Sequence, residues 1–131
     1  MKALIAENDP AIRVLLETYL SRFGECHALS QSMAAVEVFT QALASDAPYD
    51  LVLMAAHMPA MDGTEAVRQI RAMEKAQGIP RARGVHILML TSVADAAGVA
   101  RSPQEAYDGY LLKPVDLGDL LGHLRFFGFA G

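Results

Sequence analysis

The stretch Asp50-Leu-Val-Leu-Met-Ala-Ala-His-Met-Pro-Ala-Met-Asp-Gly63 decides the fold class of this sequence. After Asp50, every side chain up to Ala55 is apolar. A strand with one face in water would alternate, so this run predicts a strand that is covered on both faces. Pro59 and the pair Asp62-Gly63 then predict a loop that ends where a helix begins. A fully covered strand followed by a loop and a helix is typical of a parallel α/β sheet.

The rest of the chain repeats this alternation of apolar runs and helical stripes. Apolar runs predict further strands at residues 3–6, 26–29, 85–90 and 110–112. Helical spacing predicts helices that begin near Pro10, Ser32, Gly63 and Leu117, and a weaker one over residues 93–105. Strands and helices in alternation predict parallel strands joined by right-handed crossovers, with helices on both faces. We therefore expect one doubly wound α/β domain over residues 1–131.

The composition is that of a globular protein and gives no sign of a nucleic-acid or membrane partner. Hydrophobic residues make up 53% of the chain and charged residues 20%. The 11 basic residues are outnumbered by 15 acidic ones, and no basic stripe is visible. No apolar run approaches the roughly eighteen residues that span a membrane, and residues 3–6 are too few for the core of a signal peptide. We expect a cytoplasmic protein that binds neither nucleic acid nor membrane.

The ends of four predicted strands hold the residues that are best placed to carry chemistry. These strand ends supply Glu7, Asn8 and Asp9, then Ala55, Ala56 and His57, then Thr91 and Ser92, and finally Lys113 and Pro114. Because the carboxyl ends of parallel strands lie at one edge of the sheet, we expect these residues to lie close together. Acids, hydroxyls and a lysine at one edge suit a divalent metal ion and a phosphoryl group.

Taken together, these motifs resemble the receiver domain of bacterial response regulators over essentially the whole chain. Residues 50–63 resemble the third strand and following loop of that family, and residues 7–10 resemble its acidic first loop. Thr91 resembles its switch hydroxyl, Tyr110 its switch aromatic, and Lys113-Pro114 its lysine–proline pair. The resemblance implies a flavodoxin-like fold with five parallel strands in the order 2-1-3-4-5. We expect a single receiver domain with no output domain.

The resemblance also implies a mechanism. In such receivers a histidine kinase or phosphotransfer protein donates a phosphoryl group to an aspartate at the end of the third strand. Magnesium is held by that aspartate, by an acidic first-loop residue and by a backbone carbonyl two residues after the aspartate. Lys113, Thr91 and Ala56 would form the phosphoryl pocket. Thr91 and Tyr110 would then move and reshape the face of the fourth helix, fifth strand and fifth helix.

This sequence departs from the family pattern at two of those positions. Ala55 stands where the resemblance places the phosphate acceptor, and a methyl group cannot carry phosphate. A degenerate magnesium site would consist of Glu7, the neutral Asn8 and the backbone carbonyl of His57. Two unit charges roughly 4 Å apart interact by about 4 kcal/mol at an effective dielectric near 20, so the lost carboxylates should weaken magnesium binding severely. We expect a Glu7–Lys113 ion pair in place of the metal.

Three hypotheses for the function follow from this pattern. The first is a stand-alone, non-enzymatic receiver that cannot be phosphorylated at Ala55. It would bind a downstream protein or a second copy through the face of the fourth helix, fifth strand and fifth helix. The second is an engineered form of a competent receiver in which alanine replaces the acceptor, and the otherwise intact loop around Ala55 favours it. Asn8 and the segment 93–105, which contains Gly and Pro, instead favour a receiver that diverged naturally. The third is a nucleotide- or flavin-binding domain, which the lack of a Gly-rich loop after the first strand opposes.

Several polar and aromatic residues have simpler structural interpretations. We expect Asp9 to cap the first helix, since Pro10 follows it, and Asp62 to cap the third. We expect His86 to have a structural role. Three phenylalanines lie close together near the C-terminus, and we expect one or two of them to face the core. The others would be exposed.

Overall fold

The computed structural model describes residues 1–96 and 106–131. Its strands are β1 (Lys2–Ala6), β2 (Glu25–Leu29), β3 (Leu51–Ala55), β4 (His86–Thr91) and β5 (Gly109–Leu112). Its helices are α1 (Pro10–Leu20), α2 (Ser32–Ala44), α3 (Gly63–Ala76), α5 (Leu117–Phe127) and the 3₁₀ turn η1 (Arg81–Arg83). Every strand boundary lies within one residue of its prediction. Most of the weak helix predicted over residues 93–105 lies outside the described residues.

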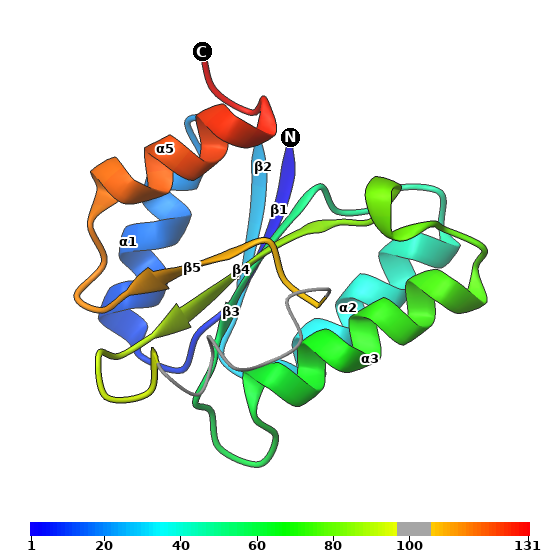
Figure 1. The fold of residues 1–131 in the computed structure, drawn as a ribbon, viewed down its shortest axis with the longest axis horizontal. Coiled ribbons are helices and arrows are strands. Elements are labelled where there is room, and N and C mark those ends of the chain that lie inside the picture. The colour runs from blue at the N-terminus through cyan, green and yellow to red at the C-terminus, as the bar shows by residue number, and fades with distance from the viewer. Residues whose placement is uncertain (97–105) are drawn as a thin grey trace.

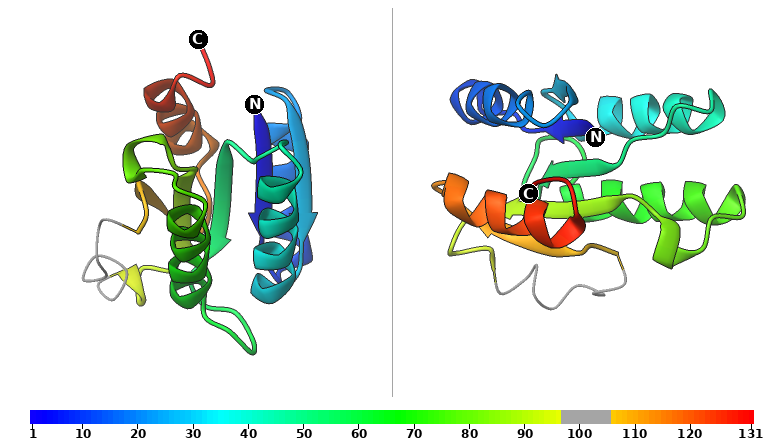
Figure 2. Two further views of the ribbon diagram at one scale, coloured as in Figure 1. Left: turned by 90° about the vertical axis from the view of Figure 1, so that its right-hand side faces the viewer. Right: turned by 90° about the horizontal axis from the view of Figure 1, so that it is seen from above.

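All strand pairs are parallel, and the strands follow the order β2-β1-β3-β4-β5. Helices α1 and α5 cover one face of the sheet, and α2 and α3 cover the other (Figures 1 and 2). The predicted doubly wound architecture is therefore confirmed. The carboxyl ends of the strands share one edge, and both chain termini lie at the opposite edge (Figure 1). None of the helices in residues 1–96 and 106–131 combines the length and the apolar character that a membrane span needs.

The core lies on both sides of the three central strands. Strand β3 is buried at every position, which explains why its sequence does not alternate. The edge strand β2, in contrast, is partly or fully exposed throughout. Burial of each large aliphatic side chain contributes roughly 1.5–3 kcal/mol. The largest fully buried side chains include those of Phe39, Leu4, Ile5, Leu16, Leu53, Ile70 and Leu88.

Helix starts agree with the sequence predictions in part. The carboxylate of Asp9 accepts hydrogen bonds from the N–H groups of Ala11 and Ile12, so the predicted cap of α1 is confirmed. Asp62 occupies the predicted N-cap position of α3, but its side chain makes no capping hydrogen bond. The N–H of Gly63 instead donates to the carbonyl of Ala56 at 2.9 Å. This bond ties the start of α3 directly to the end of β3.

The loop between β3 and α3 contains a backbone conformation that suits glycine better than the residue present. Ala60 has φ +71°, in the left-handed region where a Cβ atom costs about 1–2 kcal/mol. We therefore expect Ala60→Gly to raise the free energy of unfolding by about 0.5–1 kcal/mol, after the extra freedom of glycine in the unfolded chain is subtracted. Urea denaturation measures this change. Lower stability in the variant would contradict the interpretation.

The C-terminal aromatic residues divide between core and surface. Phe127 stacks on His86 with ring centroids 4.2 Å apart, and Phe129 meets the same imidazole edge-on at 5.5 Å. Phe126 points away and is 86% exposed. These contacts confirm that His86 is structural and that part of the aromatic cluster faces inward.

Candidate functional site

Three strands bring the predicted phosphoryl-pocket residues to one edge of the sheet. Ala55 is the last residue of β3, is fully buried and pairs with Leu90 of β4. The next N–H, that of Ala56, donates to the carbonyl of Leu90 at 2.8 Å. Thr91 ends β4, and its carbonyl accepts the N–H of Lys113 at 2.8 Å. These backbone bonds fix Ala55, Thr91 and Lys113 on neighbouring strand ends.

A buried ion pair joins the first strand end to the last. Glu7 directly follows β1 and is 0% exposed, and its Oε1 lies 2.5 Å from Nζ of Lys113, whose side chain is 26% exposed. Its Oε2 accepts the N–H of Asp9 at 3.1 Å. No other donor in the described part of the chain satisfies Oε1, so the ammonium group compensates this oxygen. The predicted Glu7–Lys113 pair is therefore present, and it makes a fully buried carboxylate tolerable.

Sequence reasoning missed one side chain beside this pair. A guanidinium N–H of Arg13, in the first turns of α1, donates to the backbone carbonyl of Glu7 at 2.9 Å. The bond orients the residue whose carboxylate meets Lys113. Nothing in the helical stripe of α1 marks Arg13 for this role, because its partner is a backbone atom outside the helix.

The residues at this edge do not fit the magnesium ion that the resemblance implies. Magnesium prefers carboxylate and water oxygens in octahedral geometry. The carboxylate of Glu7 already contacts Lys113, and one oxygen of Asp9 accepts the helix-cap bonds. Asn8 and His57 are exposed. Within residues 1–96 and 106–131, no group of three or more His, Cys, Asp or Glu side chains is placed to hold a metal ion.

The two predicted switch residues lie in different surroundings. The hydroxyl of Thr91 is buried and donates to the carbonyl of Ser92 over a long 3.4 Å. Tyr110, opposite Met89 in the β4–β5 register, is 42% exposed. The ring of Tyr110 therefore lies on the surface of the edge strand β5, while the hydroxyl of Thr91 is buried in the interior.

The lone thiol is not a candidate nucleophile. Burial, together with the charge of Glu17, raises the pKa of Cys26 to about 11, so the thiol stays protonated at neutral pH. The neighbouring His27 forms a 2.6 Å hydrogen bond with the hydroxyl of Tyr49. That bond links β2 to the loop before β3 and gives His27 a structural role.

Comparisons with known proteins agree with this arrangement. Transcriptional regulatory protein ResD of Bacillus subtilis is 34% identical over 113 residues, which cover 86% of this chain and 42% of ResD. Several curated relatives match most of this chain, and the chain spans about half the length of each of them.

Two solved structures have the same fold. One holds the receiver domain of the Saccharomyces cerevisiae response regulator Ssk1 with the histidine phosphotransfer protein Ypd1. The match has a TM-score of 0.82 and 25% identity, and covers 98% of this chain and 88% of the matched one. The other is the receiver domain of the Pseudomonas aeruginosa sensor histidine kinase PA1611, with magnesium in its active-site cleft. Its TM-score is 0.74 at 25% identity, with 97% of each chain covered.

The sequence profile of the response regulator receiver domain matches residues 3–125, which is nearly the whole chain. The profile, the strand order and the lysine at the end of β5 all lead to the same assignment. This chain belongs to the response regulator receiver domain family.

Proposed function

We propose that this receiver domain, a module of two-component and phosphorelay signalling, does not accept phosphate at the end of β3 and acts through protein–protein contacts. The observation that carries the proposal is the state of the strand-end site. Ala55 presents a buried methyl group where the family resemblance places the acceptor aspartate. Lys113, which would bind the phosphoryl oxygens, is instead paired with Glu7.

The ion pair supports a role that does not depend on phosphate. In a responsive receiver, a new charge at the end of β3 biases the equilibrium between two packings. Here the only acid in contact with Lys113 among the described residues is Glu7, which the chain itself supplies. The site therefore has its charge compensated without phosphate and without metal, and we infer that one packing is favoured permanently.

The surface of β5 and α5 is the best candidate for a partner. Tyr110 and Leu112 project from β5 with roughly two fifths of each side chain exposed, and Phe126 projects from α5. A hollow of about 510 Å³ lies between β5 and α5, lined by Tyr110, Leu112 and His123 among others. Exposed apolar groups beside a hollow are typical of protein-binding surfaces. The fourth helix of the predicted face lies largely outside the described residues.

The chemistry of the family restricts the partner to signalling proteins. Receiver domains pair with histidine kinases or phosphotransfer proteins, and the similar Ssk1 receiver is held by Ypd1. We propose that this chain retains such a partner, or a downstream protein, without phosphoryl transfer. The alternative partner is a second copy bound through the same face, and the oligomeric state at high concentration tests it.

Intact-mass spectrometry after incubation with acetyl phosphate and magnesium tests the proposal. The unaltered chain is expected to gain no phosphoryl group, and a gain would contradict the proposal. We expect the same for Ala55→Asp, because Asn8 leaves the metal without its second acid. The double variant Asn8→Asp/Ala55→Asp restores both carboxylates and is expected to gain one phosphoryl group, which makes it the positive control.

A second candidate function is that of a competent receiver that lacks only the acceptor carboxylate at position 55. It is favoured by the geometry of the remaining pocket, because Thr91 and Lys113 already lie on the neighbouring strand ends. Phosphorylation of the Ala55→Asp single variant supports this candidate. A folded Ala55→Asp protein without added phosphate supports the first.

A further inference from the structure

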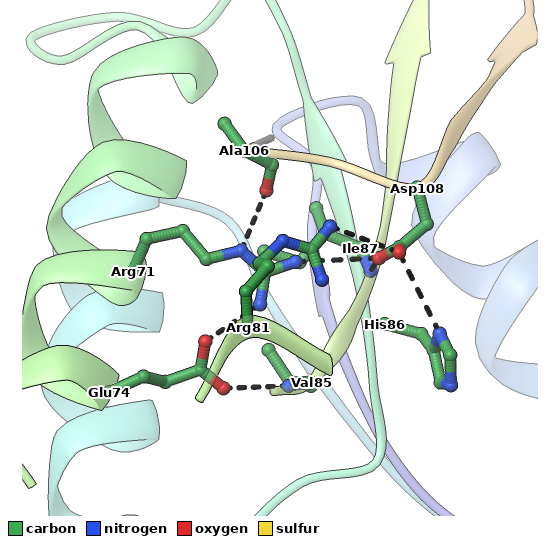
Figure 3. Close-up of polar contacts among 8 residues, drawn as sticks. All are labelled: Arg71, Glu74, Arg81, Val85, His86, Ile87, Ala106 and Asp108. Carbon is green, nitrogen blue, oxygen red and sulfur yellow. Dashed lines mark hydrogen bonds and ion pairs between the residues drawn. The ribbon is translucent and has the colours of Figure 1, made fainter. Parts of the chain in front are cut away.

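A second polar cluster lies at the opposite edge of the sheet from Ala55, at the amino-terminal ends of β4 and β5. Figure 3 shows the side chains of this cluster: Arg71 and Glu74 extend from α3, Arg81 extends from η1, and Asp108 is the residue just before β5. The side chains of Arg71, Glu74 and Asp108 are all largely buried. Ion pairs at such depth are unlike surface pairs, because each partner must be compensated within the protein.

The two carboxylates of this cluster accept backbone N–H groups at the start of β4, on the side that faces β5. Strand β5 begins only at Gly109, so the N–H groups of Val85 and Ile87 on that side have no strand to pair with. Glu74 accepts the N–H of Val85 at 2.6 Å, and Asp108 accepts the N–H of Ile87 at 2.7 Å. Both carboxylates thus replace the missing ladder bonds of a longer β5.

Arg71 connects these carboxylates to each other and to the chain before β5. One terminal nitrogen lies 2.7 Å from Glu74, the other lies 3.4 Å from Asp108, and Nε donates to the carbonyl of Ala106 at 2.8 Å. A planar guanidinium serves all three at once because each acceptor meets a different nitrogen of its rigid fork, whereas the donors of an ammonium group all belong to one atom. Arg81 adds a second contact to Asp108 at 3.0 Å.

We propose that Arg71, Glu74 and Asp108 form a clamp that fixes the start of β5 against β4 and α3. Asp108 immediately precedes β5 and Ala106 comes shortly before it in the chain, so the clamp sets where that strand begins, at the residue before Tyr110. This inference rests on the proposed function in one respect: β5 belongs to the surface that we propose binds a partner. The clamp holds the amino-terminal end of β5, while the Glu7–Lys113 pair lies just beyond its carboxyl end.

Amide hydrogen exchange measured by NMR tests the clamp without any partner or phosphate. In Arg71→Gln, Asp108 loses its ion pair with Arg71 and the chain before β5 loses the bond from Arg71 to Ala106. The Ile87 N–H donates to the Asp108 carboxylate and the Asp108 N–H donates to the Ile87 carbonyl, so both amides are expected to exchange at least about tenfold faster, relative to the core amide of Leu53. The matched control is Arg68→Gln on the same helix. Arg68 pairs with Glu65 at the surface and is 72% exposed.

The ratio to Leu53 separates the clamp from a general loss of stability. A rise confined to the starts of β4 and β5 supports the clamp, and a uniform rise, or the same pattern in Arg68→Gln, overturns it. Should Arg71→Gln fail to fold, Asp108→Asn keeps an acceptor for the Ile87 N–H but removes the charge that faces Arg71. That variant is expected to give a smaller increase at the same amides, and no local increase would overturn the clamp. Neither result depends on whether Ala55 accepts phosphate.

Discussion

Replacing Lys113 by methionine is expected to lower the free energy of unfolding by about 3 kcal/mol. This value is at the lower end of what breaking a buried ion pair costs, because the side chain of Lys113 is partly exposed. The variant leaves the carboxylate of Glu7, which is 0% exposed, without its cation. Methionine fills much of the same volume, so the loss reports the charge rather than the packing. Urea denaturation monitored by circular dichroism measures the change.

Two further variants separate the ion pair from other effects of the substitution. The double variant Glu7→Gln/Lys113→Met removes both charges and should regain most of the lost stability, because no unpaired charge is left in the interior. Arg68→Met breaks an exposed pair with Glu65 and should cost less than about 1 kcal/mol. If Lys113→Met and Arg68→Met were equally mild, the pair would not hold the site together.

Gly63→Ala is expected to lower the free energy of unfolding by about 2–3 kcal/mol, as overpacking does in a tightly packed region. A Cβ atom on Gly63 would lie 1.9 Å from the backbone carbonyl oxygen of Ala55, far inside contact distance. The obstructing atom belongs to the backbone of β3, so no side-chain rotation relieves the clash. Helix α3 would have to move away from the end of β3, and the 2.9 Å bond from Gly63 to Ala56 would break.

The matched control for this variant lies in α5. Gly122 is inside that helix, and a Cβ atom there would meet nothing within 4 Å. Gly122→Ala should therefore raise stability by about 0.5–1 kcal/mol through helix propensity alone. Thermal unfolding of the two variants should shift in opposite directions. A shift of Gly63→Ala in the same direction as Gly122→Ala would mean that α3 is not seated on β3 as described.

The sequence predicted the sheet and the ion pair because both depend on patterns that are local or set by topology. The unbroken apolar run of β3 indicates a strand covered on both faces. Once parallel strands are inferred, their carboxyl ends must converge. That convergence, together with the acids missing from the site that the family resemblance implies, led to the prediction that Glu7 meets Lys113.

The clamp could not be predicted in the same way. Arg71 and Ala106 are 35 residues apart, and their contact depends on how far α3 extends along the sheet. One signal was present in the sequence: Glu74 continues the apolar stripe of Val67 and Ile70 and is buried with them. A charged residue in an apolar stripe needs a buried partner, but the stripe does not say which one. The missing cap at Asp62 has a similar origin, because a backbone bond to β3 fixes that helix start instead.

The burial of Glu7 beside Lys113 also makes the order of substitutions matter in evolution. Ala55→Asp alone would add a second carboxylate to a strand-end site whose single ammonium group is already committed to Glu7. An aspartate at position 55 thus requires a further cation in the site, or a neutral residue at position 7, to balance the added charge. In a chain that has this buried pair, an aspartate introduced at position 55 alone is therefore disfavoured, and a compensating change elsewhere in the site would have to come first.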